Sequence, residues 1–558
     1  MTSFSSFEGT AARGKTLDRL GGERLDLLVV GGGITGCGIA RDAALRGWSV
    51  GLVEKDDFGF GTSSRSSKIV HGGVRYLEYG HFLLVKEAAQ EREILRTIAP
   101  HLVHRLDFMY PVFKGESLMK IRAGLTVFDY LASTDGKDKH TNLSPEEVRE
   151  QLPGLRDPLK GGVRYLEYIT DDARLTLENA QSAAAHGALV ANHARAERLT
   201  MRDGRVTGCL VTDTLDGTST NVEARVVINA TGVWCEEFLA AGELETEHPL
   251  IPSKGIHILL KAERLPITGA TFLRATNGKR GLAMRRLDYV YVGTTDTEYD
   301  GPLDQPRATR ADVDEVLEMV SDCFPAQKLT HEDVLATWAG VRPLIREEGR
   351  STRDTSREDA VWHSPPGLIN VAGGKLTTYR TMAQRVLSIA DAELGPAGGL
   401  PRRTAIIPLP GAEVGPQGME EFHKNRGQGL SELGVPPAIV ERLCWLYGRQ
   451  LDNFMALAVE DPAWLEPLHE DVPAIRAEVQ NAVTHEMAQT LCDFMDRRAA
   501  LLLFSDGFGL AAVEEVANIM GKELGWDATR RAQEVAEYRN AAAEHGLPPA
   551  SESLNSGR

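Results

Sequence analysis

A glycine-rich turn near the start of the chain has the spacing of a dinucleotide-binding site. The hydrophobic run 27–30 leads directly into Gly31, Gly33 and Gly36. In such a turn the first glycine allows the sharp bend, the second lets the backbone approach a pyrophosphate, and the third lets a helix pack on the strand. The phosphates then lie at a helix N-terminus, where backbone N–H groups and the helix dipole favour an anion. We expect a bound dinucleotide here rather than a glycine turn without ligand.

An acidic residue follows where a ribose contact is expected. Glu54 ends a second predicted strand, 49–53, which comes after a predicted helix over 37–46. Its carboxylate can accept hydrogen bonds from the adenosine ribose, and its charge would repel a 2′-phosphate.

Two later segments favour FAD over NAD as the dinucleotide. A predicted strand at 225–229 ends in Ala230 and Gly232, and another at 367–372 ends in Gly374 and Lys375, followed by Leu376 and Thr377. Both turns can bring backbone close to a long, extended cofactor. Each is weak taken alone, because a strand followed by glycine is common in α/β proteins.

The segment 61–76 is rich in hydroxyl groups and glycines and directly follows the Glu54 strand. Its side chains and N–H groups can line a pyrophosphate and a flavin ring, whereas composition alone also allows a solvated serine-rich loop. The residues that we assign to cofactor binding in this segment are Thr62, Ser63, Ser64, Ser67, Lys68, His71 and Gly72.

Basic residues in unusual settings form the second chemical group. His257 lies in an apolar strand, Arg342 precedes a proline, Arg353 follows a Ser-Thr pair, and Lys375 lies in the second glycine turn. Together they would make a cationic pocket for an anionic substrate such as a phosphate ester, with arginine supplying bidentate contacts. Each alone is more often a structural partner. No spacing resembles a Ser-His-Asp triad or a metal site, so we expect no metal.

Composition limits the class of protein and its partners. The chain has 558 residues, enough for two or three domains, and a net charge of −17, which argues against nucleic acid as a partner. Six scattered cysteines without a Cys-x-x-Cys pair fit a reducing compartment. No secretory signal or membrane-spanning run is visible, so we expect any membrane contact to be peripheral.

The pattern along the chain suggests an α/β protein with a helical C-terminal part. Residues 82–99 are predicted to be helical, whereas strands at 205–231, 256–260, 270–274 and 289–294 indicate an antiparallel sheet. The predicted organisation is a loose N-terminal arm at 1–24; interleaved domains at 25–396, with FAD segments near 25–100, 170–240 and 340–396 and a substrate sheet near 101–169 and 241–339; a linker at 397–416; a helical domain at 417–547; and a disordered tail at 548–558.

Several motifs, in order along nearly the whole chain, resemble those of FAD-dependent glycerol-3-phosphate dehydrogenases. The longest is TSSRSSKIVHGGVRYLE at 62–78. The others are at 170–175, 293–299, 339–344, 373–380, 485–488 and 496–498. The second copy of the GGVRYLEY octapeptide, at 161–168, differs from relatives, which usually carry an aromatic residue followed by Asp there.

The resemblance implies a glutathione-reductase-type, Rossmann-like FAD domain, an antiparallel substrate sheet and an all-α C-terminal domain. The implied reaction oxidises sn-glycerol 3-phosphate to dihydroxyacetone phosphate, with hydride passing to flavin N5. By family analogy, the substrate is held by Arg75, Arg342, Arg353 and Lys375, with Tyr76 and Thr295 nearby. His257 is our first choice of proton acceptor, because its ordinary pKa is near neutral; Lys375 and Arg342 are alternatives.

The acceptor of the electrons separates two hypotheses. A dehydrogenase would sit peripherally on the cytoplasmic face of the cell membrane and reduce quinone, with a homodimer as the candidate assembly; an oxidase would reduce O2 to hydrogen peroxide. A predicted amphipathic helix at 118–131 and a basic hairpin at 274–286 favour quinone and anionic lipid. A flavin-binding scaffold without activity is the third possibility, and the intact cationic set argues against it.

Overall fold

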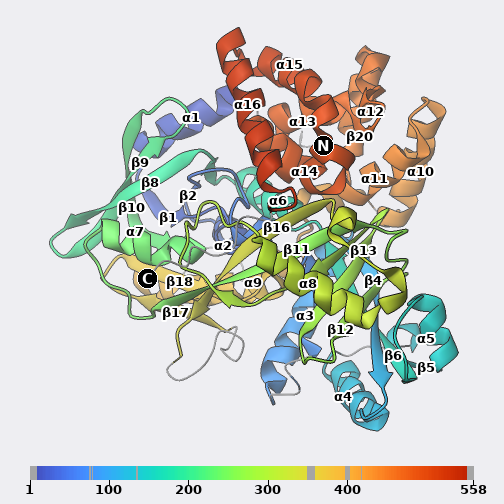
Figure 1. Cartoon of the computed structure of the whole chain (residues 1–558). Helices are drawn as coiled ribbons and strands as arrows, with labels where there is room; N and C mark the ends of the chain where they lie inside the picture. The colour runs from blue at the N-terminus through green and yellow to red at the C-terminus, as the bar shows by residue number, and fades with distance from the viewer. Residues whose placement is uncertain are drawn as a thin grey trace.

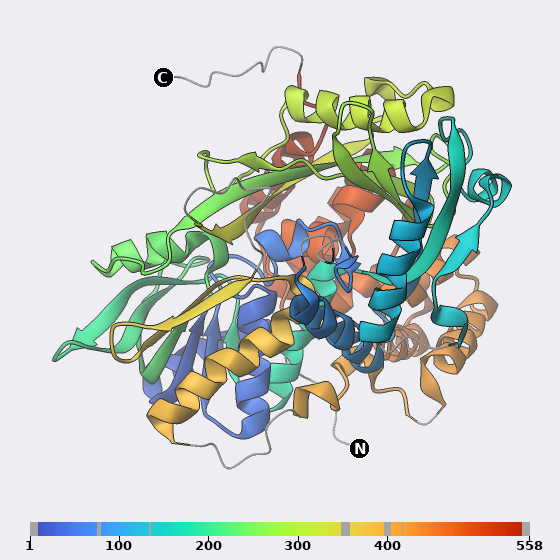
Figure 2. The same ribbon diagram turned by 90° about the horizontal axis from the view of Figure 1, so that it is seen from below.

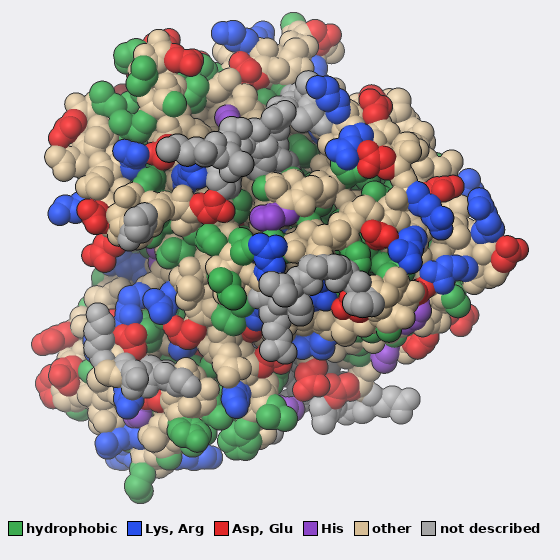
Figure 3. Space-filling view, turned by 180° about the vertical axis from the view of Figure 1, so that it is seen from behind, with side chains coloured by type: hydrophobic (Ala, Val, Ile, Leu, Met, Phe, Trp, Pro, Cys, Tyr) green, Lys and Arg blue, Asp and Glu red, His purple; other side chains and the backbone are tan. Residues whose placement is uncertain are grey.

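Two β-sheets and a C-terminal group of helices make up the protein (Figure 1). The computed structural model describes residues 9–74, 77, 80–132, 136–347, 358–395, 403–415 and 417–549. Figure 2 shows that α8 covers the outer face of the second sheet, whereas α2 and α9 lie on the opposite side of the molecule. On the face shown in Figure 3, acidic and basic side chains are interspersed over the surface.

The first sheet is the predicted nucleotide-binding sheet. Its strand order is β17-β18-β10-β1-β2-β7, with parallel neighbours except at β17, and β8 and β9 extend it beyond β10. The strands are β1 (Leu25–Val30), β2 (Val50–Val53), β7 (Leu189–Ala191), β8 (Ala194–Arg202), β9 (Arg205–Asp213), β10 (Ser219–Asn229), β17 (Asp359–His363) and β18 (Leu368–Gly373).

Both faces of this sheet are buried, which explains the unbroken apolar run of β1. Leu27 and Val29 point into a core shared with α2 (Ile34–Arg46), α6 (Asp172–Ala185) and α9 (Tyr379–Leu394). The alternate residues Leu28 and Val30 point into a second core under β8, β9 and α7 (Cys235–Ala241). Parallel strands covered on both faces need apolar side chains on both, rather than alternation.

The second sheet corresponds to the mainly antiparallel sheet predicted from the sequence. Its order is β15-β11-β14-β13-β12-β4-β6-β3, with β16 beside β11 and β5 beside β6. The strands are β3 (Ile69–Val70), β4 (Val103–Phe113), β5 (Thr141–Leu143), β6 (Leu159–Thr170), β11 (Leu250–Lys261), β12 (Ala270–Arg274), β13 (Arg280–Arg286), β14 (Tyr289–Gly293), β15 (Thr297–Glu298) and β16 (Ala336–Ile345). The expected antiparallel pairing is found except between β12 and β4, which run parallel.

Helices contribute to the buried cores on both faces of this sheet. Along β11, Ile256 and Ile258 face the core under α8 (Arg310–Cys323), whereas Leu259 faces the opposite core. The remaining helices of this half are α3 (Phe82–Ile98), α4 (Leu118–Leu131) and α5 (Pro145–Gln151). The helices predicted at 82–99 and 118–131 are therefore present.

The C-terminal region is mainly helical. Its helices are α10 (Gly418–Glu432), α11 (Pro437–Leu446), α12 (Leu451–Glu460), α13 (Arg476–His485), α14 (Leu501–Phe504), α15 (Val513–Leu524) and α16 (Ala528–Glu544), with a π-helical turn at Asp493–Arg498. The expectation of helices throughout is corrected by a small hairpin, β19 (Pro467–His469) and β20 (Val472–Ile475). Two prolines and β-branched residues in this stretch favour strand over helix.

The predicted loose arm at 1–24 is wrong over its described part. Residues Gly9–Gly22 form α1, and the buried Arg13 guanidinium binds Asp213 at 2.7 Å and the carbonyl of Asn192. The partner carboxylate lies 200 residues later, so local composition could not reveal this anchor.

The Gly/Pro-rich stretch predicted as a linker is attached to the first half where the structure describes it. Gly411 donates its N–H to Glu178, and Ile407 accepts a bond from Arg41. Most of the predicted tail at 548–558 lies outside the described residues. Within the described part of the chain, every helix falls short of the length and apolarity that crossing a bilayer requires.

Candidate active site

A cavity of about 1810 Å³ is bordered by both sheets and runs between the two groups of predicted site residues. The predicted residues that line it are Gly31, Gly33, Glu54, Thr62, Ser63, Ser67, His71, Ala230, Gly232, His257, Thr295, Arg342, Gly374, Lys375, Leu376 and Thr377. Arg75, Tyr76 and Arg353 fall outside the described residues. The fold therefore joins the glycine turns and the basic residues in one continuous space.

The glycine turn leaves no room for side chains. Gly31 has a φ of +109°, and a Cβ there would lie 2.5 Å from the carbonyl oxygen of Ala230. A Cβ at Gly36 would lie 1.8 Å from the carbonyl oxygen of Gly31. Gly36 does not line the cavity and instead allows α2 to pack on the turn, while α2 begins at the cavity after Gly33. The helix N-terminus is thus presented to an anion, as a pyrophosphate requires.

Glu54 forms the next part of the wall. Its carboxylate accepts the N–H of Gly32 at 2.6 Å and the N–H of Asp56 at 3.0 Å. Burial raises the pKa of Glu54 to about 7. The carboxylate is therefore held at the cavity edge by the glycine turn itself.

The hydroxyl-rich segment divides into residues that face the cavity and residues that hold the loop. Ser63 Oγ accepts the N–H of Ile34 at 2.9 Å, and Thr62 Oγ1 donates to the carbonyl of Val341 at 2.6 Å. Ser67 Oγ lies 2.9 Å from Nε2 of His257. This loop therefore connects α2 to the second sheet.

Three residues that we assigned to the cofactor are placed elsewhere. The Lys68 ammonium is buried and donates to Asp172 Oδ1 at 2.5 Å, and the N–H of Gly72 donates to Glu167 at 3.0 Å. Ser64 is buried beside the carbonyl of Phe60, and all three are absent from the cavity lining. The partners of Lys68 and Gly72 are distant in sequence, so the segment's composition did not distinguish these residues from those that line the cavity.

His257 lies in a setting that keeps its imidazole neutral. The ring stacks on Trp338 with centroids 4.7 Å apart, and burial, with the charges of Arg342 and Lys68, lowers the pKa of His257 to about 3. Its Nδ1 is buried with no hydrogen-bond partner among the described residues. A buried polar atom of this kind in a cavity wall is explained by a ligand or water.

The predicted anion-binding arginine is fixed by hydroxyl and carbonyl oxygens. Arg342 donates to Ser253 Oγ at 3.2 Å, to Thr294 Oγ1 at 2.8 Å and to the Thr295 carbonyl at 3.3 Å. These contacts orient the guanidinium at the cavity edge. Lys375 reaches the same cavity from a turn in which Gly373 and Gly374 both have a φ of +80°.

Sequence reasoning missed several lining residues. Arg65 lines the cavity and is bound by Asp496, which lies 431 residues later. A further group of mainly apolar residues extends the cavity beneath α4, namely Leu77, Leu84, Phe108, Tyr110, Ile121, Leu125, Tyr165, Phe272 and Leu282. The apolar face of the predicted helix at 118–131 was the signal for this lobe.

The basic hairpin predicted to meet lipid is largely paired within the protein. Arg286 is buried against Asp171, Arg274 binds Glu116, and Lys279 binds Glu318. Acidic residues from other elements therefore pair with three of the five basic side chains at 274–286, and this segment is less cationic than its own sequence indicates.

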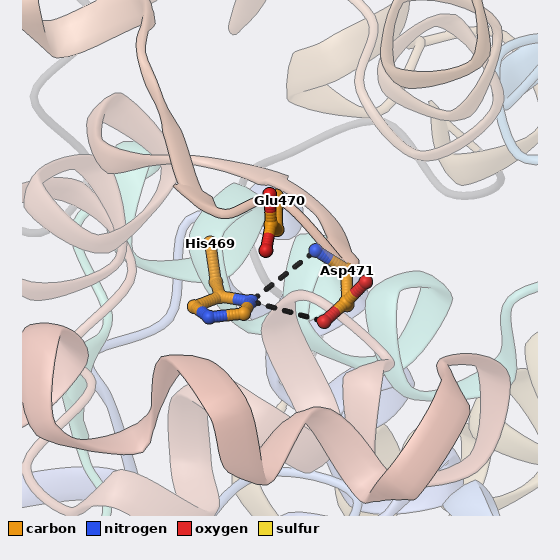
Figure 4. A group of neighbouring side chains, drawn as sticks. All are labelled: His469, Glu470 and Asp471. Atoms are coloured by element: carbon orange, nitrogen blue, oxygen red, sulfur yellow. Dashed lines mark hydrogen bonds and ion pairs between the residues drawn. The ribbon is translucent and has the colours of Figure 1, made fainter.

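A possible metal-binding group lies on the turn between β19 and β20. Figure 4 shows His469, Glu470 and Asp471 on this turn. Their candidate ligand atoms all lie within 4.8 Å of one another. The turn does not belong to the cavity lining, and exposed acidic groups of this kind are common without an ion.

The cavity lining fits a flavin dinucleotide. The side-chain-free glycine turn matches a pyrophosphate, Glu54 matches a ribose, and the cavity continues to His257 and Arg342. The indole N–H of Trp234, buried on the same wall, also has no partner among the described residues.

Comparisons with known proteins agree with this reading of the cavity. A family model described as FAD dependent oxidoreductase matches residues 26–380. A second, described as the C-terminal domain of alpha-glycerophosphate oxidase, matches residues 402–531. The two matches correspond to the pair of sheets and to the helical region.

Similar proteins match over nearly their whole length. The glycerol-3-phosphate dehydrogenase of Mycobacterium leprae is 38% identical over 96% of this chain and 91% of its own. The aerobic glycerol-3-phosphate dehydrogenase of Bacillus subtilis is 35% identical over 94% and 95%. The solved structure of the Bacillus halodurans glycerol-3-phosphate dehydrogenase complexed with FAD has a TM-score of 0.82 and 33% identity, covering 99% of this chain and 100% of that one. The chain belongs to the FAD-dependent glycerol-3-phosphate dehydrogenase family.

Proposed function

We propose that the protein oxidises sn-glycerol 3-phosphate to dihydroxyacetone phosphate and passes the electrons to a membrane quinone. The observation that carries this proposal is the single cavity, which joins a dinucleotide-type glycine turn to a cationic end at His257, Arg342 and Lys375. The names of the similar proteins supply the substrate, and the cationic end suits its phosphate.

Arg342 is the best-supported contact to the phosphate. Its three hydrogen bonds hold the guanidinium in place before substrate arrives, so little side-chain entropy is lost on binding. Lys375 adds a second cation on the same cavity. Arg75, Tyr76 and Arg353 remain part of the proposed substrate site by family resemblance, and Thr295 forms wall beside Arg342.

His257 is the proposed proton acceptor. Bound FAD supplies the two-electron acceptor, at flavin N5. As the C2–H bond of the substrate breaks, the hydroxyl proton on C2 passes to the neutral imidazole, whose orientation is held by Ser67 and by the Trp338 ring. A pKa of about 3 makes free His257 a weak base. The phosphate of a bound substrate offsets the charge of Arg342, which raises the basicity of the imidazole when it is needed.

The apolar lobe supports quinone over O2 as the electron acceptor. Ile121, Gly124 and Leu125 of α4 line this lobe, whereas Met119 and Tyr130 of the same helix are 79% and 84% exposed. On the neighbouring α3, Leu83 is 85% exposed. A helix with an apolar outer face beside an apolar cavity suits an interfacial position, where a lipid-soluble quinone is available. In Figure 1, α4 lies at the lower edge of the molecule, away from α15 and α16.

An anaerobic titration tests the proposal. The purified protein should show a flavin spectrum that glycerol 3-phosphate bleaches, and a short-chain quinone should restore the oxidised spectrum. Failure of the substrate to bleach bound flavin would refute the substrate. If air rapidly restores the oxidised flavin spectrum and hydrogen peroxide forms, whereas quinone does not restore the spectrum, the oxidase alternative is favoured.

The membrane part of the proposal has its own test. The triple variant Leu83→Ser, Met119→Ser and Tyr130→Ser should bind phospholipid vesicles less tightly than the wild-type protein. Its reduction by glycerol 3-phosphate in solution should be unchanged, since these side chains point away from the cavity. Equal vesicle binding by both proteins would reject α3 and α4 as the contact surface.

A further inference from the structure

The segment Asp493–Arg498 of the C-terminal domain contacts loops of the first domain that border the cavity. Asp496 binds Arg65 through two hydrogen bonds, 3.1 Å to Nη1 and 2.7 Å to Nη2. Arg497 and Arg498 both bind Asp57, each at 2.7 Å. The segment is a π-helical turn, a geometry that often occurs at functional sites.

The Asp496–Arg65 pair is shielded from water. The side chain of Asp496 is 5% exposed and that of Arg65 is 14% exposed. A bidentate pair of this kind fixes both the position and the orientation of the guanidinium. Arg497 also lies 3.3 Å from Asp496, and the cations hold the pKa of Asp496 well below its usual range.

Arg65 belongs to a loop whose other residues define the active-site wall. The indole N–H of Trp338 donates to the Ser66 carbonyl at 3.3 Å, and Thr62 donates to the carbonyl of Val341. Ser67, which follows Ser66, makes a hydrogen bond through its Oγ with Nε2 of His257. The loop 62–67 therefore lies against β16 and immediately beside the proposed proton acceptor.

The fit of this loop on β16 is close. A Cβ at Gly340 would lie 2.5 Å from the carbonyl oxygen of Arg65. Two residues further along β16 is Arg342, so a shift of the loop would move the surroundings of the proposed phosphate contact as well.

The C-terminal domain also holds β16 from another direction. The Thr337 N–H donates to the carbonyl of His545 at 2.7 Å, and Nδ1 of His545 lies 2.8 Å from the Thr337 carbonyl. The domain thus contacts both the loop and the strand on which the loop rests.

We propose that Asp496 is a positioning residue, which acts through Arg65 to hold loop 62–67 against β16 and thereby sets the geometry of Ser67 and His257. The C-terminal domain is then part of the active-site machinery rather than a separate appendage. The kinetic readout below rests on the proposed function, whereas the binding and spectroscopic readouts do not.

The test compares Asp496→Asn with a matched control, Asp506→Asn. Asp506 also joins the C-terminal domain to the second sheet, through Lys261 and Tyr289, but none of these residues lines the cavity. We expect D496N to change the visible circular dichroism of bound FAD and to slow flavin reduction at saturating glycerol 3-phosphate about tenfold or more, because small displacements in an active site are costly. D506N should match the wild-type protein in both.

A second variant separates positioning from loss of folding. Arg65→Met leaves Asp496 paired with Arg497, so the buried carboxylate keeps a partner. If Asp496 acts through Arg65, then R65M and the double variant D496N/R65M should show the same defect. Defects that multiply in the double variant would overturn the proposal.

Two further measurements complete the test: the melting temperature of each apoprotein and the dissociation constant of its complex with FAD. A D496N protein with a lower melting temperature but a wild-type flavin dichroism and a wild-type reduction rate would show a purely structural role and overturn the proposal. If glycerol 3-phosphate fails to reduce even the wild-type flavin, the proposed function falls. The dichroism and FAD affinity of the same variants then still decide whether Asp496 positions the loop.

Discussion

The two ends of the cavity are built in different ways. The glycine end is made of backbone: Gly31, Gly33 and Gly36 lie within six residues, and the carboxylate of Glu54 is bound to the same turn. The cationic end is made of side chains on separate elements, with His257 on β11, Arg342 on β16 and Lys375 after β18. A backbone site fails when a side chain is added, whereas a side-chain site fails when one is removed.

This comparison predicts that the largest effect on turnover comes from the cationic end. Replacement of His257 by Asn should lower the rate of flavin reduction by about 10²–10⁴-fold, the usual contribution of a general base. FAD binding should persist, because the glycine end is untouched. Stopped-flow reduction under anaerobic conditions measures the rate.

His331→Asn serves as the control for that variant, since His331 pairs with Asp314 at the surface. A near-wild-type rate of flavin reduction in H257N would show that another group accepts the proton, and that His257 does not contribute to chemistry at the cationic end.

At the glycine end, adding one methyl group should weaken the cofactor rather than the chemistry. Gly36→Ala places a Cβ 1.8 Å from the Gly31 carbonyl oxygen, so α2 must move away from the turn. Overpacking of this kind costs about 1–3 kcal/mol, which corresponds to a roughly 5- to 150-fold loss of FAD affinity.

Gly14→Ala is the matched control, because Gly14 is also helical and a Cβ there meets nothing within 4 Å. Equilibrium titration of the apoproteins with FAD compares the two. Equal affinity in G36A and the wild-type protein would show that the turn tolerates expansion.

A conservative change at the cationic end should have an intermediate effect. Arg342→Lys keeps the charge but loses the fork that binds Ser253, Thr294 and the substrate phosphate together. We expect kcat/KM for glycerol 3-phosphate to fall about tenfold, mainly through KM. Arg385→Lys, at an exposed pair with Asp359, should change neither constant. An unaltered KM in R342K would argue against Arg342 as the phosphate contact.

The smallest expected effect concerns the stability of the apoprotein and its dependence on pH. Burial raises the pKa of Glu54 from 4.5 to about 7, so the folded protein binds more protons than the unfolded chain between these values. Stability should therefore fall as pH rises from 4.5 to 7, by roughly 1–3 kcal/mol from this group. Urea unfolding across this range should show that component in the wild-type protein and not in Glu54→Gln. If the free energy of unfolding depends on pH in the same way in the wild-type protein and in Glu54→Gln, the raised pKa of Glu54 is contradicted.

The same contrast explains which parts of the site could be predicted. The glycine turn and Glu54 were predicted because their spacing reflects one local strand–turn–helix–strand unit. Lys68 was misassigned because its partner, Asp172, comes 104 residues later, and Arg65 was missed because its partner, Asp496, is more distant still. Long-range pairing leaves no local pattern.

The fold shows a similar limit. Many strands of the two sheets followed from apolar runs and turns, whereas β4, β6 and β16 were not predicted, and the parallel β12–β4 pair departed from the expected antiparallel arrangement. The basic hairpin at 274–286 was predicted to meet lipid, because its own sequence contains no hint of Asp171, Glu116 and Glu318. A run of basic residues predicts a lipid-facing surface only when no acidic side chains from other elements pair with it.

We propose that one cavity brings C2 of glycerol 3-phosphate to bound FAD. The most direct measurement is anaerobic single-turnover reduction of the FAD-loaded protein by glycerol 3-phosphate and by the same compound deuterated at C2. We expect the flavin band to bleach with both substrates, and more slowly with the deuterated one, because the C2–H bond breaks as the flavin is reduced. A protein that holds FAD but is not bleached by either compound would refute the proposed function.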